Sequence, residues 1–150
     1  MDEFIEKTAD YFENKISDAT VAFCKSNKGS KNIKIYHSKV KEVVDEIKEI
    51  PKGKRTYGLN MTLVNGSLII KDITTALVTL IDNKEDGQDD PMWSYHMGLC
   101  FFNEGKLKRE AALPYFKKFM EYTETNYFDE DMIRNMRFMI NMIDDKKYFL

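Results

Sequence analysis

The sequence has little cysteine and proline and no long run of apolar residues. Its two cysteines, Cys24 and Cys100, are too few for a disulfide framework, so we expect free thiols, with a single bridge between them as the alternative. No apolar segment approaches the ~20 residues that a transmembrane helix requires. The first residues are acidic and amphipathic, whereas a signal peptide begins with basic residues and an apolar block. The sequence therefore predicts a cytoplasmic protein without membrane segments.

The chain also lacks a strong excess of charge of either sign. It has 23 lysines and arginines against 25 aspartates and glutamates, which gives a formal net charge of -2. The basic stretches at residues 25–34 and 52–55 are interpreted as solvated loops whose charge is offset by acidic residues nearby. A dedicated nucleic-acid-binding protein usually has a basic excess. The charge balance therefore argues against nucleic acid as a partner.

Apolar residues recur three or four positions apart along most of the chain, which is typical of amphipathic helices. The pattern predicts helices over residues 2–26, 33–50, 72–83, 91–104 and 108–124, and a last helix with apolar residues from Met132 to Ile143. Pro51 and Pro91 fall between these segments, and residues 84–90 are predicted to form a turn. We expect one all-α domain over residues 1–150, with about six or seven antiparallel helices, the first pair lying in residues 1–55.

The segment 56–70 is ambiguous. Asn65 and Gly66 stand between two apolar runs, which is a signal for a β-hairpin. The same residues also fit a helix that is weakened by glycine. The local sequence leaves both structures open.

A spacing of small and bulky residues recurs in the second half of the chain. A glycine lies between bulky residues in one predicted helix, a second glycine follows in the turn, and an alanine precedes an aromatic residue in the next helix. These positions are Met97, Gly98, Phe101, Gly105, Ala112 and Phe116. Ala76 and Leu80 repeat the spacing of the last pair. In these residues the chain resembles a tetratricopeptide repeat.

The resemblance extends over residues 56–143. One good repeat follows a degenerate one at 56–83, in which Val64 stands where Gly98 stands in the better repeat, and residues 129–143 would cap the stack. The resemblance implies stacked helical hairpins, because such a hairpin buries its apolar face only against its neighbours. It favours a helix for 56–70, and it implies that Gly98 lets a second backbone come close. A helical bundle without true repeats is the alternative.

Residues able to do chemistry are scarce. His96 and Cys100 are four residues apart, but a zinc site needs three or four ligands, and Cys24 and His37 lie in distant segments. We expect Cys100 to be buried and His96 to lie at a helix surface. The sequence shows no set of nucleophile, base and orienting group. It therefore predicts no catalytic residue, no metal and no cofactor.

Acidic residues and aromatic residues are the candidates for partner binding. Carboxylates before the predicted helices are interpreted first as helix caps, and otherwise as contacts to a basic partner. The helix 91–104 is apolar around nearly its whole circumference, as in a helix that is central or that faces a partner. Core packing and partner binding both remain open for it. The candidate partner-binding residues are Trp93, Tyr95, Asp86, Asp89, Asp90, Glu124 and Asp129.

These features favour a non-enzymatic protein-binding module. Its most concrete version is a small bacterial immunity protein that binds and neutralises a toxin through aromatic anchors and a charged rim. A second version is an adaptor or chaperone that holds a peptide segment in a tetratricopeptide-like groove. The alternative of a different class is a metal-binding or enzymatic helical protein that uses the histidines and cysteines.

Overall fold

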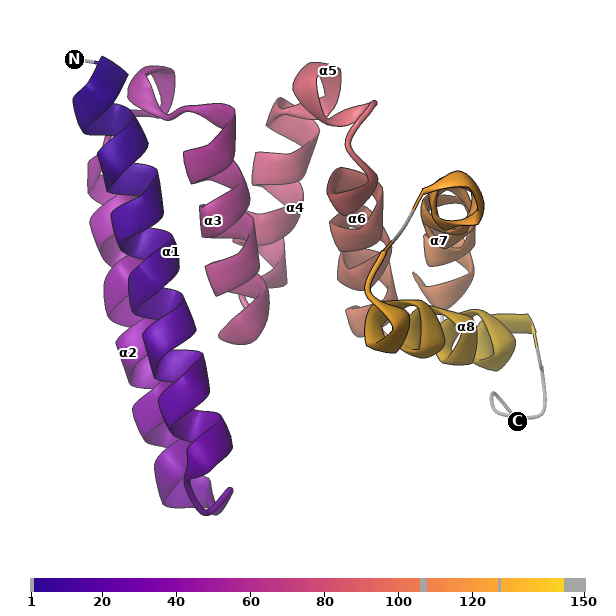
Figure 1. Cartoon of the computed structure of the whole chain (residues 1–150), viewed down its shortest axis with the longest axis horizontal. Coiled ribbons are helices and arrows are strands. Elements are labelled where there is room, and N and C mark those ends of the chain that lie inside the picture. Colours follow the sequence, from indigo (N-terminus) through magenta and orange to yellow (C-terminus); the bar gives the residue numbers. More distant parts are fainter. Residues whose placement is uncertain (1, 106–107, 127, 145–150) are drawn as a thin grey trace. The chain divides into compact units, whose positions relative to one another are not determined.

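The computed structural model describes residues 2–105, 108–126 and 128–144. Within them the chain has eight α-helices, one short 3-10 turn and no strand, which confirms the predicted all-α class (Figure 1). The elements are α1 (Asp2–Lys25), α2 (Ser30–Glu49), η1 (Lys52–Lys54), α3 (Tyr57–Ile69), α4 (Ile73–Asp82), α5 (Lys84–Gly87), α6 (Pro91–Asn103), α7 (Arg109–Thr125) and α8 (Glu130–Asp144).

The chain forms two compact units, residues 1–83 and 84–150. The prediction of a single domain over the whole chain stays a prediction. Most helices agree with the apolar periodicity, although α2 begins at Ser30 rather than at residue 33. The turn predicted for 84–90 is wrong in part, because residues Lys84–Gly87 form the short helix α5.

The ambiguous segment 56–70 is a helix and not a β-hairpin. The hydroxyl oxygen of Thr56 accepts a hydrogen bond from the Leu59 N–H at 3.1 Å and so caps the start of α3. Gly66 lies inside this helix, where a Cβ would stand 2.7 Å from Cγ2 of Val44 and 3.3 Å from Cδ1 of Ile16. The glycine that suggested a turn therefore serves the close approach of α3 to α1 and α2.

The core of the first unit lies between α1, α2 and α3. Its buried residues recur three or four positions apart along each helix, so that each helix turns one apolar stripe toward the other two. They are Phe12, Ile16, Ala19, Val40, Val43, Val44, Ile47, Leu59 and Leu63. The N-terminal helical pair predicted for residues 1–55 is thus part of a three-helix core.

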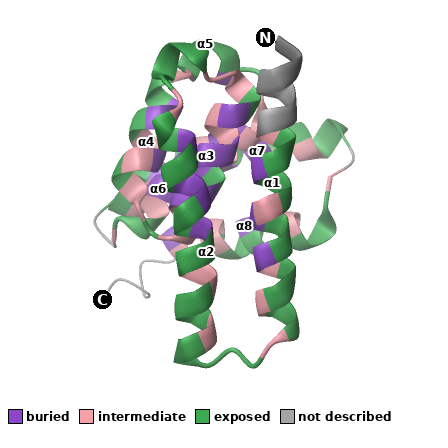
Figure 2. Ribbon diagram, turned by 90° about the vertical axis from the view of Figure 1, so that its left-hand side faces the viewer, coloured by how far each residue is buried: buried purple, intermediate pink, exposed green. Residues whose placement is uncertain are grey.

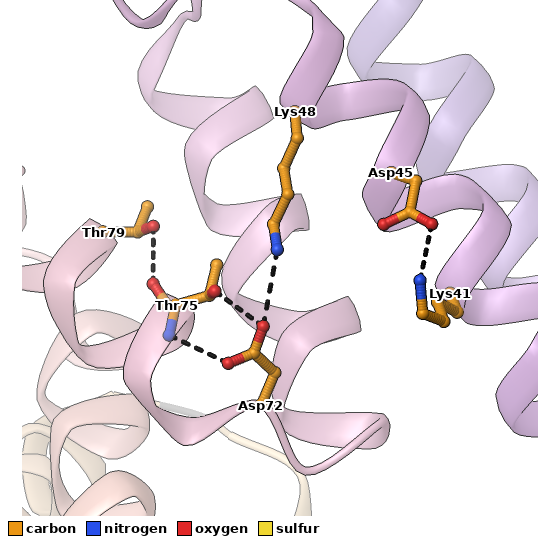
Figure 3. Close-up of polar contacts among 6 residues, drawn as sticks. All are labelled: Lys41, Asp45, Lys48, Asp72, Thr75 and Thr79. Carbon is orange, nitrogen blue, oxygen red and sulfur yellow. Dashed lines mark hydrogen bonds and ion pairs between the residues drawn. The ribbon is translucent and has the colours of Figure 1, made fainter.

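The start of α4 is held by Asp72 (Figure 3). One carboxylate oxygen accepts from the Thr75 N–H at 3.2 Å, and the other accepts from the Thr75 hydroxyl at 2.6 Å. Lys48 of α2 lies 3.4 Å from the same carboxylate and links α2 to the start of α4. The hydrogen bond from the Thr75 hydroxyl is the largest of the contacts that lower the pKa of Asp72.

The second unit is organised by the crossing of α6 and α7. Gly98 of α6 faces the fully buried ring of Phe116 on α7, and a Cβ on Gly98 would overlap this ring. The close approach predicted at Gly98 is therefore present, but an aromatic ring fills it rather than a backbone. Ala112 is also fully buried.

The remaining parts of the second unit complete this core. Gly105 follows α6 with a φ of +127°, in the region that favours glycine, which suits the predicted turn. Met136 and Ile143 of α8 pack into one cluster with Phe119 of α7. The classification of these hairpins as tetratricopeptide repeats stays a prediction.

We expect Gly98→Ala to lower the free energy of unfolding by about 1–3 kcal/mol, because the buried ring of Phe116 leaves no room for the added carbon. Gly58→Ala is the matched control inside α3. A Cβ there meets only Oγ1 of Thr56 at 4.0 Å, so this change should raise stability by up to about 1 kcal/mol. Urea denaturation followed by circular dichroism measures both, and equal effects would contradict the packing role of Gly98.

Candidate functional site

Trp93 lies in the interior and not on a partner-facing side. The residue is only 6% exposed. Its indole packs on Gly87 of α5, where an added Cβ would overlap the ring, and its ring centroid lies 6.2 Å from that of Tyr115 on α7, edge to face. Of the two alternatives left open for this helix, core packing therefore holds for Trp93, because α5 and α7 enclose this side of α6.

Tyr95 is half-buried. Its ring centroid lies 5.4 Å from that of Phe119 and 5.6 Å from that of His96. Burial raises the pKa of the Tyr95 hydroxyl above its ordinary value. Most of the ring is therefore committed to packing within the second unit, and its role in partner binding stays a prediction.

Two of the candidate acidic residues are helix caps. Asp90 accepts a hydrogen bond from the Met92 N–H at 3.0 Å, and Asp129 accepts one from the Met132 N–H at 3.0 Å. These contacts confirm the capping interpretation for α6 and α8.

The other three acidic candidates, Asp86, Asp89 and Glu124, are exposed. Their contact with a basic partner stays a prediction.

His96 and Cys100 are both buried in α6. The burial of Cys100 was predicted, but the prediction that His96 lies at the surface is wrong, because the residue is only 8% exposed. Burial lowers the pKa of His96 to about 4, against a smaller opposing effect of Asp90. Burial also raises the pKa of the Cys100 thiol to about 12. Neither group has the protonation behaviour that nucleophilic or acid–base chemistry near neutral pH requires.

The four histidines and cysteines do not form a metal site in the part of the chain that the structure describes. Within that part there is no group of three or more histidine, cysteine, aspartate or glutamate side chains that could hold a metal ion. Cys24 is exposed and free, and Cys100 is buried and free.

The ends of α1 and α2 form a second candidate site, which the sequence interpretation missed. Gly66, in the last turn of α3, abuts Ile16 of α1 and Val40 of α2. The residues between these two positions extend past α3 as a two-helix projection (Figure 1). We call residues 19–39 of this projection the distal hairpin; Ser17 and Asp18, which follow Ile16, are not part of it.

The two arms of the distal hairpin hold each other. The rings of Phe23 and Tyr36 are stacked, with centroids 4.9 Å apart and planes at 10°. The Thr20 and Tyr36 hydroxyls are hydrogen bonded at 2.9 Å. These contacts position the arms, although among the described helices of the first unit no third helix covers them here.

Aliphatic side chains of the distal hairpin remain open to solvent. Val21 is 47% exposed, Ile33 38% and Ile35 44%. Ile33 continues the apolar stripe of α2 that is buried from Val40 onward, and it is exposed because α3 ends before reaching it. Figure 2 shows the end of this helix pair in the colours of exposed and intermediate residues.

The distal hairpin is strongly basic. It contains five lysines (25, 28, 31, 34 and 39) and no aspartate or glutamate. The interpretation of residues 25–34 as a loop is wrong in part, because Lys25 belongs to α1 and residues 30–34 belong to α2. The acidic residues next to the hairpin are Asp18 and Glu42, which line a hollow together with Lys39. The acid-free run was the signal in the sequence, but the missing third helix is a property of the tertiary structure.

Comparison with known proteins finds no family model that matches the sequence, no curated protein that matches it and no solved structure that matches the fold. Among the helices that the structure describes, none has the length and apolar character needed to cross a membrane.

We expect Trp93→Ala to lower the free energy of unfolding by about 3–5 kcal/mol, because it removes a large side chain from the interior. Trp93→Phe should cost less, since it keeps a ring against Gly87 and Tyr115. Thermal denaturation followed by circular dichroism measures both. A Trp93→Ala protein that unfolds at the wild-type temperature would contradict the buried position.

The stability of the protein should fall between about pH 6.5 and pH 4 because of His96. In this range the unfolded chain binds a proton on this imidazole that the folded chain excludes until the pH reaches about 4. The loss is up to about 3 kcal/mol at full effect. His96→Leu should remove this part of the pH dependence, as urea denaturation across the range would measure. The wild type and His96→Leu contain the same carboxylates, so only His96 should distinguish their pH dependence. Identical profiles of stability against pH would contradict the buried, neutral state of His96.

Proposed function

We propose that this chain is a non-enzymatic protein-binding module and that the distal hairpin is its contact surface. The observation that carries the proposal is the apolar stripe of α2, which runs on past the end of α3 and leaves Ile33 open to solvent. An apolar stripe without a third helix costs solvation free energy in the isolated protein. A partner that covers Val21, Ile33 and Ile35 would recover this free energy.

The protonation states of the buried groups on α6 support a binding role over the enzymatic or metal-binding alternative. A thiol whose pKa is about 12 is protonated near neutral pH. The neighbouring His96 is nearly inaccessible. These groups are better suited to the interior of a scaffold than to a reaction with a substrate.

The most concrete form of the proposal is a small bacterial immunity protein that binds and neutralises a toxin. A helical hairpin held by the Phe23–Tyr36 stack is an ordered element, so that little conformational entropy is lost on binding. A rigid projection of this kind suits insertion into a concave surface of a folded partner. The tetratricopeptide resemblance belongs to the same proposal and supplies the scaffold that presents the hairpin.

The test is binding to the product of the gene adjacent to the one that encodes this chain. We expect a stable complex by titration calorimetry and restored growth of cells that express this neighbouring protein. Val21→Ser/Ile35→Ser should weaken the complex by at least about tenfold, because both side chains are lost from the contact surface.

The matched control is Val78→Ser/Ile81→Ser on α4, where the same residue types are 47% and 55% exposed outside the distal hairpin. This variant should bind like the wild type. Equal binding by an isolated extended peptide of the partner would favour the adaptor or chaperone. The absence of any complex or rescue would contradict the immunity function.

A further inference from the structure

We propose that the distal hairpin docks an acidic, partly apolar segment of a partner protein along the row formed by Lys31, Ile35 and Lys39. This inference rests on the proposed function, because it names the partner chemistry of the same surface. The three residues are four positions apart in turn, so they line one side of α2. The row places an aliphatic side chain between two ammonium groups.

The charge of the distal hairpin sets the sign of the partner. Its five lysines give a formal charge of +5, and because the whole chain carries -2, all other residues together carry -7. Within the described part of the chain these five lysines form no ion pair. Lys39 shares a hollow with Asp18 and Glu42, so the field that can attract and orient an acidic surface comes mainly from the lysines between residues 25 and 34.

The lysines at the start of α2 oppose the local stability of the helix. A helix N-terminus carries a partial positive charge, which favours acidic residues there. α2 instead has no acidic residue in its first turn, and its N-cap is Gly29, which has no side chain that could accept a capping hydrogen bond. Lys31 adds further positive charge at this end. Such a conflict between local sequence and structure is a mark of a site kept for binding.

A hollow beside the row gives space for an apolar side chain of the partner. It has a volume of about 190 Å³ and lies between the two arms of the distal hairpin. Its lining includes Ala22, Phe23, Ile35 and Tyr36, and Lys39 borders it. A leucine or similar residue seated there would bring flanking carboxylates toward Lys31 and Lys39.

The side-chain composition favours protein over nucleic acid and lipid. The distal hairpin contains lysines but no arginine, which is the residue suited to bidentate phosphate contacts. The rings of Phe23 and Tyr36 stack on each other rather than standing free for bases, and the third ring, that of His37, lies beside Tyr36 with centroids 5.8 Å apart. Ile33 and Ile35 are two positions apart and so point to different sides of α2, so that a flat lipid surface would cover only one of them, whereas a concave protein surface can contact both.

The experiment titrates the isotope-labelled full chain with four probes and follows its backbone amides by NMR. The first probe is a synthetic helical peptide with glutamates flanking leucines on one face, and the second has serines in place of the leucines. The third is an oligothymidylate of equal negative charge, and the fourth is vesicles that contain phosphatidylserine. We expect the glutamate–leucine peptide to bind most tightly, with shifts confined to residues 19–39, and the serine peptide to bind at least about tenfold more weakly.

Lys31→Glu/Lys39→Glu should weaken binding of the glutamate–leucine peptide by at least about tenfold, because it reverses both charges of the row. Lys52→Glu/Lys54→Glu in η1 makes the same change of net charge on exposed residues outside the distal hairpin, and it should retain binding. Equal losses in the two variants would overturn the proposal, because they would show attraction by net charge alone.

A stability measurement gives a second readout that requires no partner. Lys31→Glu should raise the melting temperature by about 2–4 °C, because it places an acidic residue in the first turn of α2. A lower melting temperature would overturn the statement that the lysine is kept against the stability of the helix.

Each of the remaining outcomes would overturn either the inferred occupant of the hairpin or the proposed function. Tighter binding of the oligonucleotide or the vesicles, no binding of any probe, or self-association by sedimentation would overturn the acidic protein segment as the occupant. The proposed function fails by itself if the peptide docks on the distal hairpin but the product of the adjacent gene does not bind. This inference fails by itself if that product binds Lys31→Glu/Lys39→Glu as tightly as the wild type.

Discussion

The apolar stripe of α2 is the feature on which the first unit depends. Val40, Val44 and Ile47 are fully buried where α1 and α3 enclose them. The same stripe continues toward the start of the helix, where α3 no longer covers it and Ile33 is exposed. The same apolar stripe thus contributes to the buried core and to the uncovered distal hairpin. The stripe becomes exposed at the point where α3 ends.

Glycines decide how closely the helices approach in both units. Gly66 lets α3 meet Val44 and Ile16, and Gly98 accepts the ring of Phe116. In each case the absence of a Cβ allows a close contact that a larger residue would prevent. The helix-weakening effect of glycine is offset by packing that is available only after the helices have met. This explains why Gly66 belongs to a helix although its local sequence resembles a turn.

The charged residues at the helix starts favour helix stability at α4, α6 and α8 and oppose it at α2. Asp72, Asp90 and Asp129 each accept a backbone hydrogen bond at the start of a helix. The start of α2 instead has lysines and the N-cap Gly29, which has no side chain to accept a backbone hydrogen bond. The capping carboxylates have a structural role in starting their helices. The lysines of the distal hairpin, which form no ion pair in the described part of the chain, have no such role. The basic residues of the distal hairpin, rather than the capping carboxylates, are therefore the charged groups left for contact with a partner.

The sequence by itself determined the all-helical class, most helix positions, the caps and the burial of Cys100, because apolar periodicity and capping chemistry act over a few residues. Only the tertiary structure decided that Trp93 and His96 are buried, since α6 is apolar nearly all round and periodicity cannot choose its outer side. It alone also decided that α3 packs beside α1 and α2 at a level short of the distal hairpin. That placement depends on contacts between segments far apart in the chain, which no local pattern records.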